Sequence, residues 1–318
     1  MNALGMERDL AEDSDFSKVE IFLSVTDLGL RTSISEVLRY IGVRTILVGQ
    51  TLTEILEHLQ DNTPDLLICS AHFPDGELFP KVRELRHHKW GKNPFIPIMT
   101  VTDQPSNEMV KEVLESGVDD LLIQPISTGQ LRDRISGLAK NRKQFVVTTD
   151  YVGPTRRANN SDRGTEIPMI DVPNTLRTKV TGEDEAVDLS VAIKNTLSEI
   201  NEQKVERHGF QLAYLAERIV DPNHPNQLIN DSATLLDDLI AVAEETRDRM
   251  ESTRYAHTST LCGSILEVAH SIRDAGGSPV EKDLGLLNPL AQAILIGFSD
   301  SEAASAANAI ADKVAQAE

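Results

Sequence analysis

The sequence predicts an α/β domain with a (βα)5 pattern, followed by an all-α helical-bundle domain. Up to about residue 140, five short apolar runs alternate with amphipathic stretches, which is typical of a parallel sheet covered by helices on both faces. Beyond residue 183 the apolar residues recur only at helical spacing. The chain has 318 residues, of which 40% are hydrophobic, and this is enough for two separate cores.

The five apolar runs are predicted to be buried strands at residues 19–25, 43–48, 65–69, 96–101 and 119–123. Turn and breaker residues bound them, namely Gly42, Pro64, Pro94 and Gly117. Between the runs, apolar side chains recur every three or four positions, as from Ile34 to Ile41 and from Leu131 to Leu138. We therefore expect residues 18–143 to form one (βα)5 domain, preceded by a flexible acidic start at residues 1–17.

Residues 144–182 are predicted to be a linker because prolines and polar residues replace the apolar pattern. This segment contains the sequence DYVGPTRR, whose Tyr151, Arg156 and Arg157 are candidate interaction residues. An arginine pair can hold an acidic surface or a phosphate, or dock on the chain's own acidic domains. Three apolar stripes with helical spacing then predict a bundle of five or six helices in residues 183–318, ending in an alanine-rich stretch at 301–318.

Charge and composition exclude several classes of protein. The formal net charge is −19, and 24 acidic against 10 basic residues follow residue 180, so duplex DNA is not an expected partner. No apolar run approaches the roughly 20 residues that span a bilayer, and the start is acidic, so we expect a cytoplasmic protein without a membrane partner. Cys69 and Cys262 lie among apolar neighbours and are predicted to be buried free thiols.

Residues 20–140 resemble the receiver domain of bacterial two-component response regulators. The resemblance rests on four motifs in order, IFLSVTD, PDLLICSAHFPDG, IPIMTVTD and SGVDDLLIQPIS, and implies a flavodoxin-like fold. In that family an acidic pair binds magnesium, an aspartate accepts phosphate, a Ser/Thr and an aromatic relay the change, and a lysine precedes proline. The resemblance places Val25 and Thr26, followed by Asp27, at the acidic pair, Ser70 at the acceptor, Thr102 at the Ser/Thr, Leu121 at the aromatic and Gln124 at the lysine.

Only Thr102 and Pro125 match the family pattern, so the resemblance implies a degenerate pseudo-receiver without a cofactor. Magnesium prefers oxygen ligands that include carboxylates, and Val25 offers none. Without the metal and the lysine, charge on a transferring phosphoryl group stays uncompensated. The leading hypothesis is a non-enzymatic adaptor of a two-component phosphorelay pathway that acts by protein–protein interaction. Its expected partners are a histidine kinase, a receiver or an output protein, with a homodimer as a further option.

In receivers, one face is formed by the fourth helix, the fifth strand and the fifth helix. Through this face receivers commonly pair with themselves or with output domains. On this face the sequence offers the candidate interaction residues Glu108, Lys111, Asp119, Asp120 and Arg132. Mixed charge suits a polar interface, although a solvated helix surface is the simpler interpretation.

Several alternatives remain open on the sequence. AHSIRDAGG resembles a histidine phosphotransfer motif, so a phosphotransfer or phosphatase role through His270 is the alternative function; the neighbouring acidic Glu267 and Asp274 oppose it. Asp27, Asp75 and Asp103 each follow a strand and could form a displaced metal site. Ser70 with His72 suggests a nucleophile and base, and nucleotide binding is a last option that no glycine-rich loop supports. His257 is predicted to be a core or interface histidine.

Overall fold

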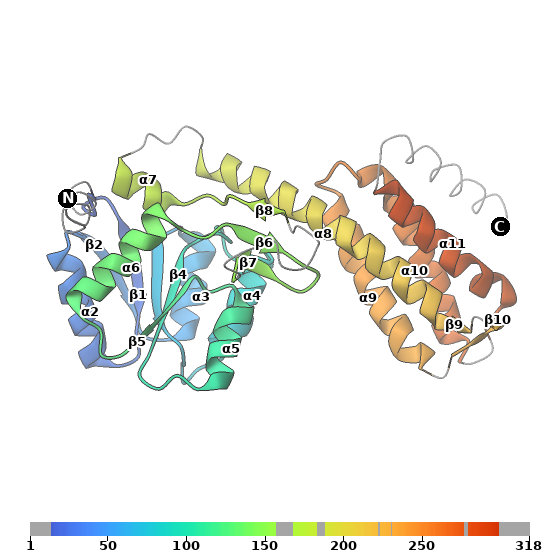
Figure 1. Ribbon diagram of the computed structural model, residues 1–318, viewed down its shortest axis with the longest axis horizontal. Coiled ribbons are helices and arrows are strands. Elements are labelled where there is room, and N and C mark those ends of the chain that lie inside the picture. The colour runs from blue at the N-terminus through green and yellow to red at the C-terminus, as the bar shows by residue number, and fades with distance from the viewer. Residues whose placement is uncertain are drawn as a thin grey trace, which may run out of the picture. The chain divides into compact units, whose positions relative to one another are not determined.

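The computed structural model of the protein describes residues 14–156, 168–182, 188–221, 223–229, 231–276 and 279–298 (Figure 1). The chain divides into two compact units, Met1–Thr196 and Leu197–Glu318. The division falls inside helix α8 (Leu189–Ile219), whereas the sequence suggested a boundary near residue 183.

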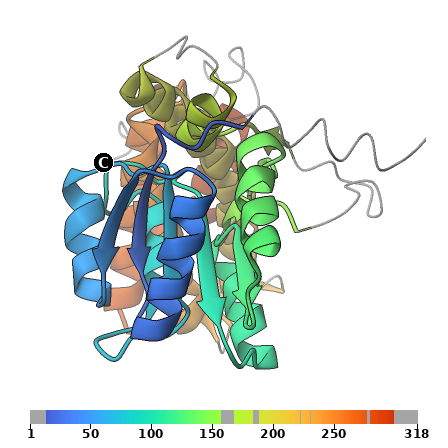
Figure 2. The same cartoon turned by 90° about the vertical axis from the view of Figure 1, so that its left-hand side faces the viewer.

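The first unit contains a five-stranded parallel sheet with the strand order β2-β1-β3-β4-β5 (Figure 2). Its strands are β1 (Glu20–Ser24), β2 (Thr45–Gly49), β3 (Leu66–Ser70), β4 (Ile98–Thr102) and β5 (Asp120–Ile123). Each lies within or beside a predicted apolar run. The runs at β3 and β4 are entirely buried, as expected for central strands covered on both faces.

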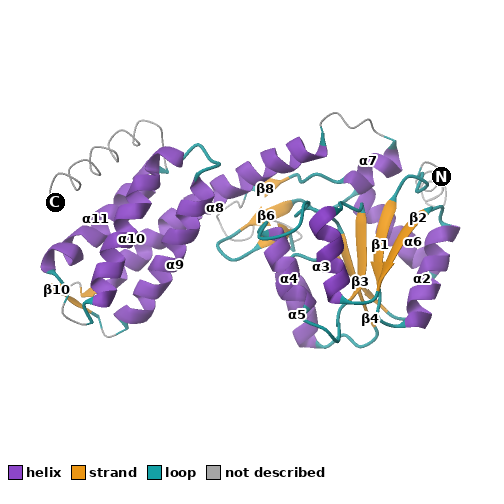
Figure 3. Cartoon of the chain, turned by 180° about the vertical axis from the view of Figure 1, so that it is seen from behind, coloured by secondary structure: helices purple, strands orange, loops and turns teal. Residues whose placement is uncertain are grey.

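Five helices cover this sheet: α2 (Leu28–Tyr40), α3 (Leu52–Asp61), α4 (Leu78–Arg86), α5 (Asn107–Ser116) and α6 (Thr128–Lys140). Helices α2 and α6 pack on one face and α3, α4 and α5 on the other, each side with its own apolar core (Figure 3). Four of the five begin at a capping side chain, namely Asp27, Thr51, Ser106 and Ser127. The predicted (βα)5 fold is confirmed.

The segment that the sequence suggested as a linker contains regular structure. Strands β6 (Phe145–Val147), β7 (Val152–Pro154) and β8 (Met169–Ile170) form an antiparallel sheet of order β7-β6-β8. Helix α7 (Thr175–Thr181) packs on α6 and adds Leu176 and Val180 to the core beneath it. The start of the chain was also misjudged: Phe16, predicted to lie in a flexible terminus, is 4% exposed and belongs to the same core. The burial of Phe16 follows from its apolar ring, because removing that ring from water stabilises the fold.

The second unit is built from α8, α9 (Ser232–Met250), the 3-10 helix η1 (Ala256–Thr258), α10 (Ser259–Asp274) and α11 (Glu281–Gly297). The prediction of helices alone is wrong in one place. Strands β9 (Val220–Asp221) and β10 (His224–Leu228) form a hairpin, in which the Asp221 carboxylate accepts a hydrogen bond from the backbone N–H of Asn223. The helix predicted at 301–318 lies outside the described residues.

Charged and polar side chains of α8 and α9 meet in the interior of the second unit. Lys204 is fully buried with its Nζ 3.3 Å from the Glu245 carboxylate, and Arg249 lies 2.8 Å from the same oxygen. Beside them His208, 1% exposed, shares a hydrogen bond of 3.1 Å with the Thr246 hydroxyl. Burial lowers the pKa of His208 to about 4. Burial also disfavours the charge of Glu245, but Lys204 and Arg249 outweigh it and bring its pKa to about 2.

The two cysteines, Cys69 and Cys262, are buried and free, as predicted. Burial raises the pKa of both thiols, that of Cys262 to about 12. Among the described residues no helix is both long enough and apolar enough to span a bilayer.

Candidate functional site

The candidate site lies where β1, β3 and β4 end at the same edge of the sheet. Ser70 is the last residue of β3, and Thr26 follows β1. The backbone N–H of Thr26 donates to the Ser70 Oγ over 3.0 Å, and the two hydroxyl oxygens lie 3.2 Å apart. Val25, beside them, is fully buried. The two hydroxyl groups thus satisfy each other, and the Val25 position contributes only an apolar contact.

The remaining predicted site residues complete this edge. Thr102 ends β4 with 7% exposure, and its hydroxyl accepts a hydrogen bond of 3.3 Å from the backbone N–H of Gln104. Gln124 follows β5, precedes a cis peptide bond to Pro125, and donates its backbone N–H to the Thr102 carbonyl over 2.9 Å. Leu121 packs against the core under α3, α4 and α5.

The Arg31 side chain was not singled out in the sequence. It is nearly buried on α2, and its guanidinium donates to the Val25 carbonyl over 2.6 Å. Its position three residues before Ile34, on the buried face of a predicted helix, was the only available signal. Arg31 therefore fixes the backbone of Val25 at the end of β1.

Two of the loop aspartates, Asp27 and Asp75, serve as helix caps. Asp27 accepts the backbone N–H of Leu30 over 2.6 Å at the start of α2. Asp75 accepts those of Leu52 and Thr53, each over 3.0 Å, at the start of α3, and these hydrogen bonds lower the pKa of its carboxyl group. Within the part of the chain that the structure describes, no three His, Cys, Asp or Glu side chains are grouped so that they could hold a metal ion. The structure thus does not bring Asp27, Asp75 and Asp103 together as such a group.

The comparison with known families agrees with this architecture. Residues 26–136 match the family model of the response regulator receiver domain. This part of the chain is a receiver domain. It is the kind of domain that two-component systems use, and receiver domains interact with histidine kinases and other signalling proteins.

Curated relatives match part of the chain and are longer proteins. The chain is 24% identical to a cyclic di-GMP phosphodiesterase of Thermotoga maritima, over 54% of this chain and 42% of that protein. It is 32% identical to the sensor histidine kinase TmoS of Ectopseudomonas mendocina, over 39% of this chain and 12% of that protein. The matches thus span less than half the length of these relatives.

Solved structures of receiver domains are similar to a part of the chain. One is the receiver domain of a sensor histidine kinase from Pseudomonas aeruginosa, with a magnesium ion in its active-site cleft; it is 22% identical and covers 37% of this chain and 94% of its own, with a TM-score of 0.33. Another is the chemotaxis response regulator CheY4 of Vibrio cholerae, also 22% identical, covering 37% and 97%, with a TM-score of 0.33.

Asp119, predicted to belong to an interaction face of the receiver domain, is instead an internal anchor. Its side chain is only 2% exposed and lies 2.9 Å from the Arg86 guanidinium and 2.7 Å from that of Arg142. Both guanidinium groups also lie over the Phe145 ring of β6, at 5.3 and 5.1 Å. Burial lowers the pKa of Arg86 to about 10, against the opposing effect of Asp119. The prediction failed because Asp119 precedes β5 at the amino end of the strand, where the two arginines enclose it.

The other residues predicted for that face stay near solvent. Lys111 lies 3.9 Å from Glu115, Arg132 lies 3.6 Å from Asp133, and Asp120 pairs with Arg134 at 3.0 Å. Partial burial raises the pKa of the Asp120 carboxyl group, although Arg134 opposes the shift. Glu108 is exposed in the first turn of α5.

The sequence YVGP in the supposed linker docks the β6–β7 hairpin on the receiver. A Cβ atom on Gly153 would lie 2.6 Å from the Tyr151 hydroxyl and 2.8 Å from the Cα of Gly117, so only glycine fits. The Arg156 guanidinium donates to the carbonyls of Val113 and Leu114, each over 3.3 Å, where the α5 helix ends. The expected docking of Arg156 on the chain itself is confirmed, but its acceptors are backbone carbonyls; Arg157 lies outside the described residues.

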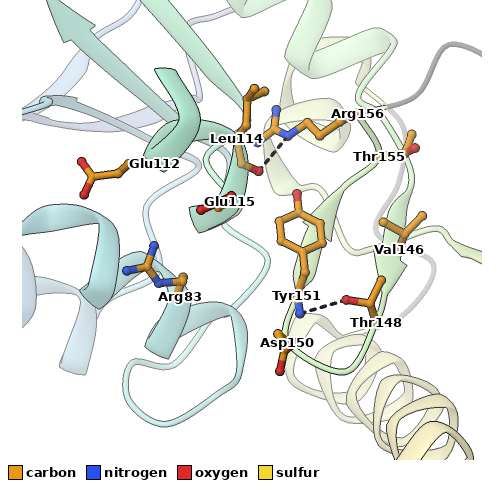
Figure 4. A pocket seen from close by; sticks show the side chains of 10 residues that line it. All are labelled: Arg83, Glu112, Leu114, Glu115, Val146, Thr148, Asp150, Tyr151, Thr155 and Arg156. Atoms are coloured by element: carbon orange, nitrogen blue, oxygen red, sulfur yellow. Dashed lines mark hydrogen bonds between the residues drawn. The ribbon is translucent and has the colours of Figure 1, made fainter. Parts of the chain in front are cut away.

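This docking leaves a cleft of about 690 Å³ between α4, α5 and the hairpin (Figure 4). The Tyr151 ring stands at its centre, with Leu114 on the α5 side and Val146 on the hairpin side. Leu114 is 44% exposed. Charged side chains of both signs surround this apolar centre, namely Arg83, Glu112, Glu115, Asp150 and Arg156.

Of the two histidines that the sequence singled out in the second unit, His257 differs from its prediction. His257, predicted to be internal, is exposed, and its ring interacts with the Arg254 carbonyl at 3.1 Å, because η1 turns the chain before α10 begins. His270 is partly exposed on α10, and its Nδ1 lies 2.9 Å from an Arg273 guanidinium nitrogen. Arginine can only donate, so Nδ1 is the acceptor and the neutral ring carries its proton on Nε2.

Proposed function

We propose that the receiver domain is a pseudo-receiver, and that the protein acts as a non-enzymatic adaptor of a two-component pathway without phosphorylation at Ser70. The observation that carries the proposal is the pairing of the Ser70 and Thr26 hydroxyls beside the buried Val25 side chain. By the family resemblance, these three positions hold the acceptor and its metal ligands.

The chemistry of phosphoryl transfer supports this proposal. A transferring phosphoryl group carries negative charge that magnesium and a lysine normally offset. The Gln124 amide carries no charge, and Asp27 is already engaged with the first turn of α2. A magnesium ion at Ser70 would have hydroxyl oxygens as its nearest protein ligands, and magnesium sites are built with one or two carboxylates.

An adaptor also needs a surface for its partners, and the cleft around Tyr151 offers one. It combines an apolar centre with charges of both signs, which is the composition of a partner-binding surface with a polar rim. We infer that a histidine kinase, receiver or output protein of the pathway binds there.

The test is treatment of the full chain with acetyl phosphate and magnesium, followed by intact mass measurement. We expect no stable phosphorylated species. The control is the Thr26→Asp, Ser70→Asp, Gln124→Lys triple variant, which returns a metal ligand, the acceptor and the cation and is expected to gain a phosphoryl group. Phosphorylation of the unmodified chain within residues 20–140 would overturn the proposal.

The alternative of phosphotransfer through His270 is disfavoured by its geometry. A neutral imidazole with its proton on Nε2 and its Nδ1 bonded to Arg273 has no lone pair ready to attack phosphorus. Arg273 also lies 3.8 Å from Asp237 and 3.5 Å from Asp274, so carboxylates adjoin the ring's partner and repel an incoming phosphate.

A further inference from the structure

Strand β2 forms one border of the parallel sheet, and its outer edge is the feature that the proposed function leaves unexplained (Figure 2). It pairs only with β1, in an unbroken parallel register from Glu20 opposite Thr45 to Ser24 opposite Gly49. Among the described residues no other strand pairs with it. The backbone N–H and C=O groups on its outer side therefore remain available for pairing.

Two apolar side chains of β2 are exposed, one on each face of the sheet. Leu47 is 36% exposed and Val48 is 53% exposed, and adjacent strand residues point to opposite faces. Edge strands are ordinarily protected by charges, proline or a bulge. The sequence TILVG of β2 has no charge and no proline, and its regular register excludes a bulge. The opposite edge, β5, is shorter and carries the Asp120–Arg134 ion pair.

We propose that β2 pairs antiparallel with β2 of a second copy of this chain, with the two-fold axis at Leu47. This register places Leu47 opposite its counterpart and Ile46 opposite Val48, so every central pair is apolar. Thr45 then faces Gly49, the buried end of the strand. A symmetric pairing of one strand with itself is the isologous contact of a two-fold dimer.

Charges at the two ends of the strand complement each other in this register. Arg44 is exposed immediately before β2. Glu54 is exposed after it, and its carboxylate accepts the backbone N–H of Gln50 over 2.5 Å, which holds the carboxylate beside the end of the strand. Antiparallel pairing sets Arg44 of one copy opposite Gln50 of the other, next to Glu54. Two such pairs form across the axis, so the charges of this edge complement those of a second copy of the same edge. A partner that lacks this arrangement of charges would bind less well.

The first experiment is sedimentation velocity of the full chain over a concentration series. We expect reversible dimers with a dissociation constant on the order of micromolar, because one strand pair buries less than a standard interface. Val48→Lys adds a charge to the edge and is expected to weaken dimerisation at least ~tenfold. The matched control is Val110→Lys on α5, a valine 37% exposed, which leaves dimerisation unchanged. A wild-type chain that stays monomeric at high concentration, or a Val48→Lys chain that dimerises equally well, overturns the proposal.

Cysteine cross-linking tests the register. Residues directly opposite in an antiparallel pair are close enough for a disulfide, and both native cysteines are buried. Leu47→Cys is expected to give a covalent dimer under mild oxidation. Ile123→Cys, on the opposite edge strand with 43% exposure, is expected to stay monomeric. Cross-linking of Ile123→Cys without cross-linking of Leu47→Cys rejects the proposed interface. A Leu47→Cys thiol that stays reduced because another part of the chain shields it from the oxidant also rejects it.

Discussion

The Asp119→Asn substitution is expected to destabilise the receiver domain severely, because it neutralises the carboxylate that both buried arginines, Arg86 and Arg142, contact. The Asp119 carboxylate accepts hydrogen bonds from Arg86 at 2.9 Å, from Arg142 at 2.7 and 3.1 Å, and from the backbone N–H of Ile98 at 2.8 Å. The exposed fractions of the Arg86 and Arg142 side chains are 0% and 5%. Asparagine keeps the volume, so no cavity confuses the result.

The magnitude follows from the cost of an uncompensated buried charge. Breaking a buried ion pair by neutralising one partner costs about 3–5 kcal/mol of unfolding free energy. Both arginines keep their hydrogen bonds to backbone carbonyls: Arg86 still donates to those of Gly117, Pro94 and Ile96, and Arg142 to that of Phe95. These bonds hold the guanidinium groups in place, where each retains its charge and loses its counter-ion. We therefore expect a loss within that range.

The assay is urea denaturation followed by tryptophan fluorescence. Trp90 is the single tryptophan of the chain and donates its indole N–H to the Lys81 carbonyl over 3.0 Å, so its signal reports on the receiver domain alone. The matched control is Asp120→Asn, which breaks the pair with Arg134, a side chain that is 49% exposed, and should cost at most about 1 kcal/mol. Equal midpoints for the two variants would contradict the assignment of Asp119 as a buried anchor.

Three further outcomes are expected. Burial lowers the pKa of His208 to about 4, so its neutral form stabilises the second unit above the unfolded pKa of about 6.5, and this stability falls by about 2 kcal/mol at pH 5. The His208→Gln variant should therefore show a smaller change in melting temperature between pH 6.5 and 5, measured by circular dichroism. Glu245, with a pKa of about 2, does not titrate in that window. Gly153→Ala should cost about 1–3 kcal/mol by fluorescence-detected denaturation, whereas Gly137→Ala, with nothing within 4 Å, should stabilise helix α6 by about 0.5–1 kcal/mol. His270→Ala should leave the dephosphorylation rate of a phosphorylated receiver unchanged in a phosphate-release assay, and a slower rate would revive the phosphotransfer function.

The sequence was sufficient for the parallel sheet because each strand is a short apolar run that ends at a glycine, proline or cap. It was insufficient for β6, β7 and β8, which have three, three and two residues. Strands this short carry no periodicity. They are held by contacts from distant parts of the chain, such as the Arg86 and Arg142 guanidinium groups over Phe145.

The same limit applies to the charged residues. The family resemblance placed Ser70 and Thr26 at one edge, and the structure brings their hydroxyls together. Asp119 and Asp120 are adjacent and chemically identical, yet one is buried between arginines and the other lies near solvent. Only the tertiary partner distinguishes them, and no local pattern encodes that partner. His208 likewise carried no signal, because its burial depends on the meeting of α8 with α9.

The distribution of charge within the receiver domain bears on how an adaptor of this kind could work. At the carboxyl ends of the strands, where the family places its switch, Ser70 and Thr26 are neutral. At the amino ends of β4 and β5, a buried cluster around Asp119 ties both strands to β6, while Arg156 holds the end of α5. Strand β5 and helix α5 belong to the face that receivers commonly present to partners. These contacts hold the face from the end of the sheet opposite to the Ser70 pocket. We therefore expect even the triple variant, which regains the acceptor, to show little change in hydrogen exchange along α5 after phosphorylation. A large change in hydrogen exchange along α5 would mean that the charges restored in the triple variant set the conformation of this face, and not the contacts of Asp119 and Arg156.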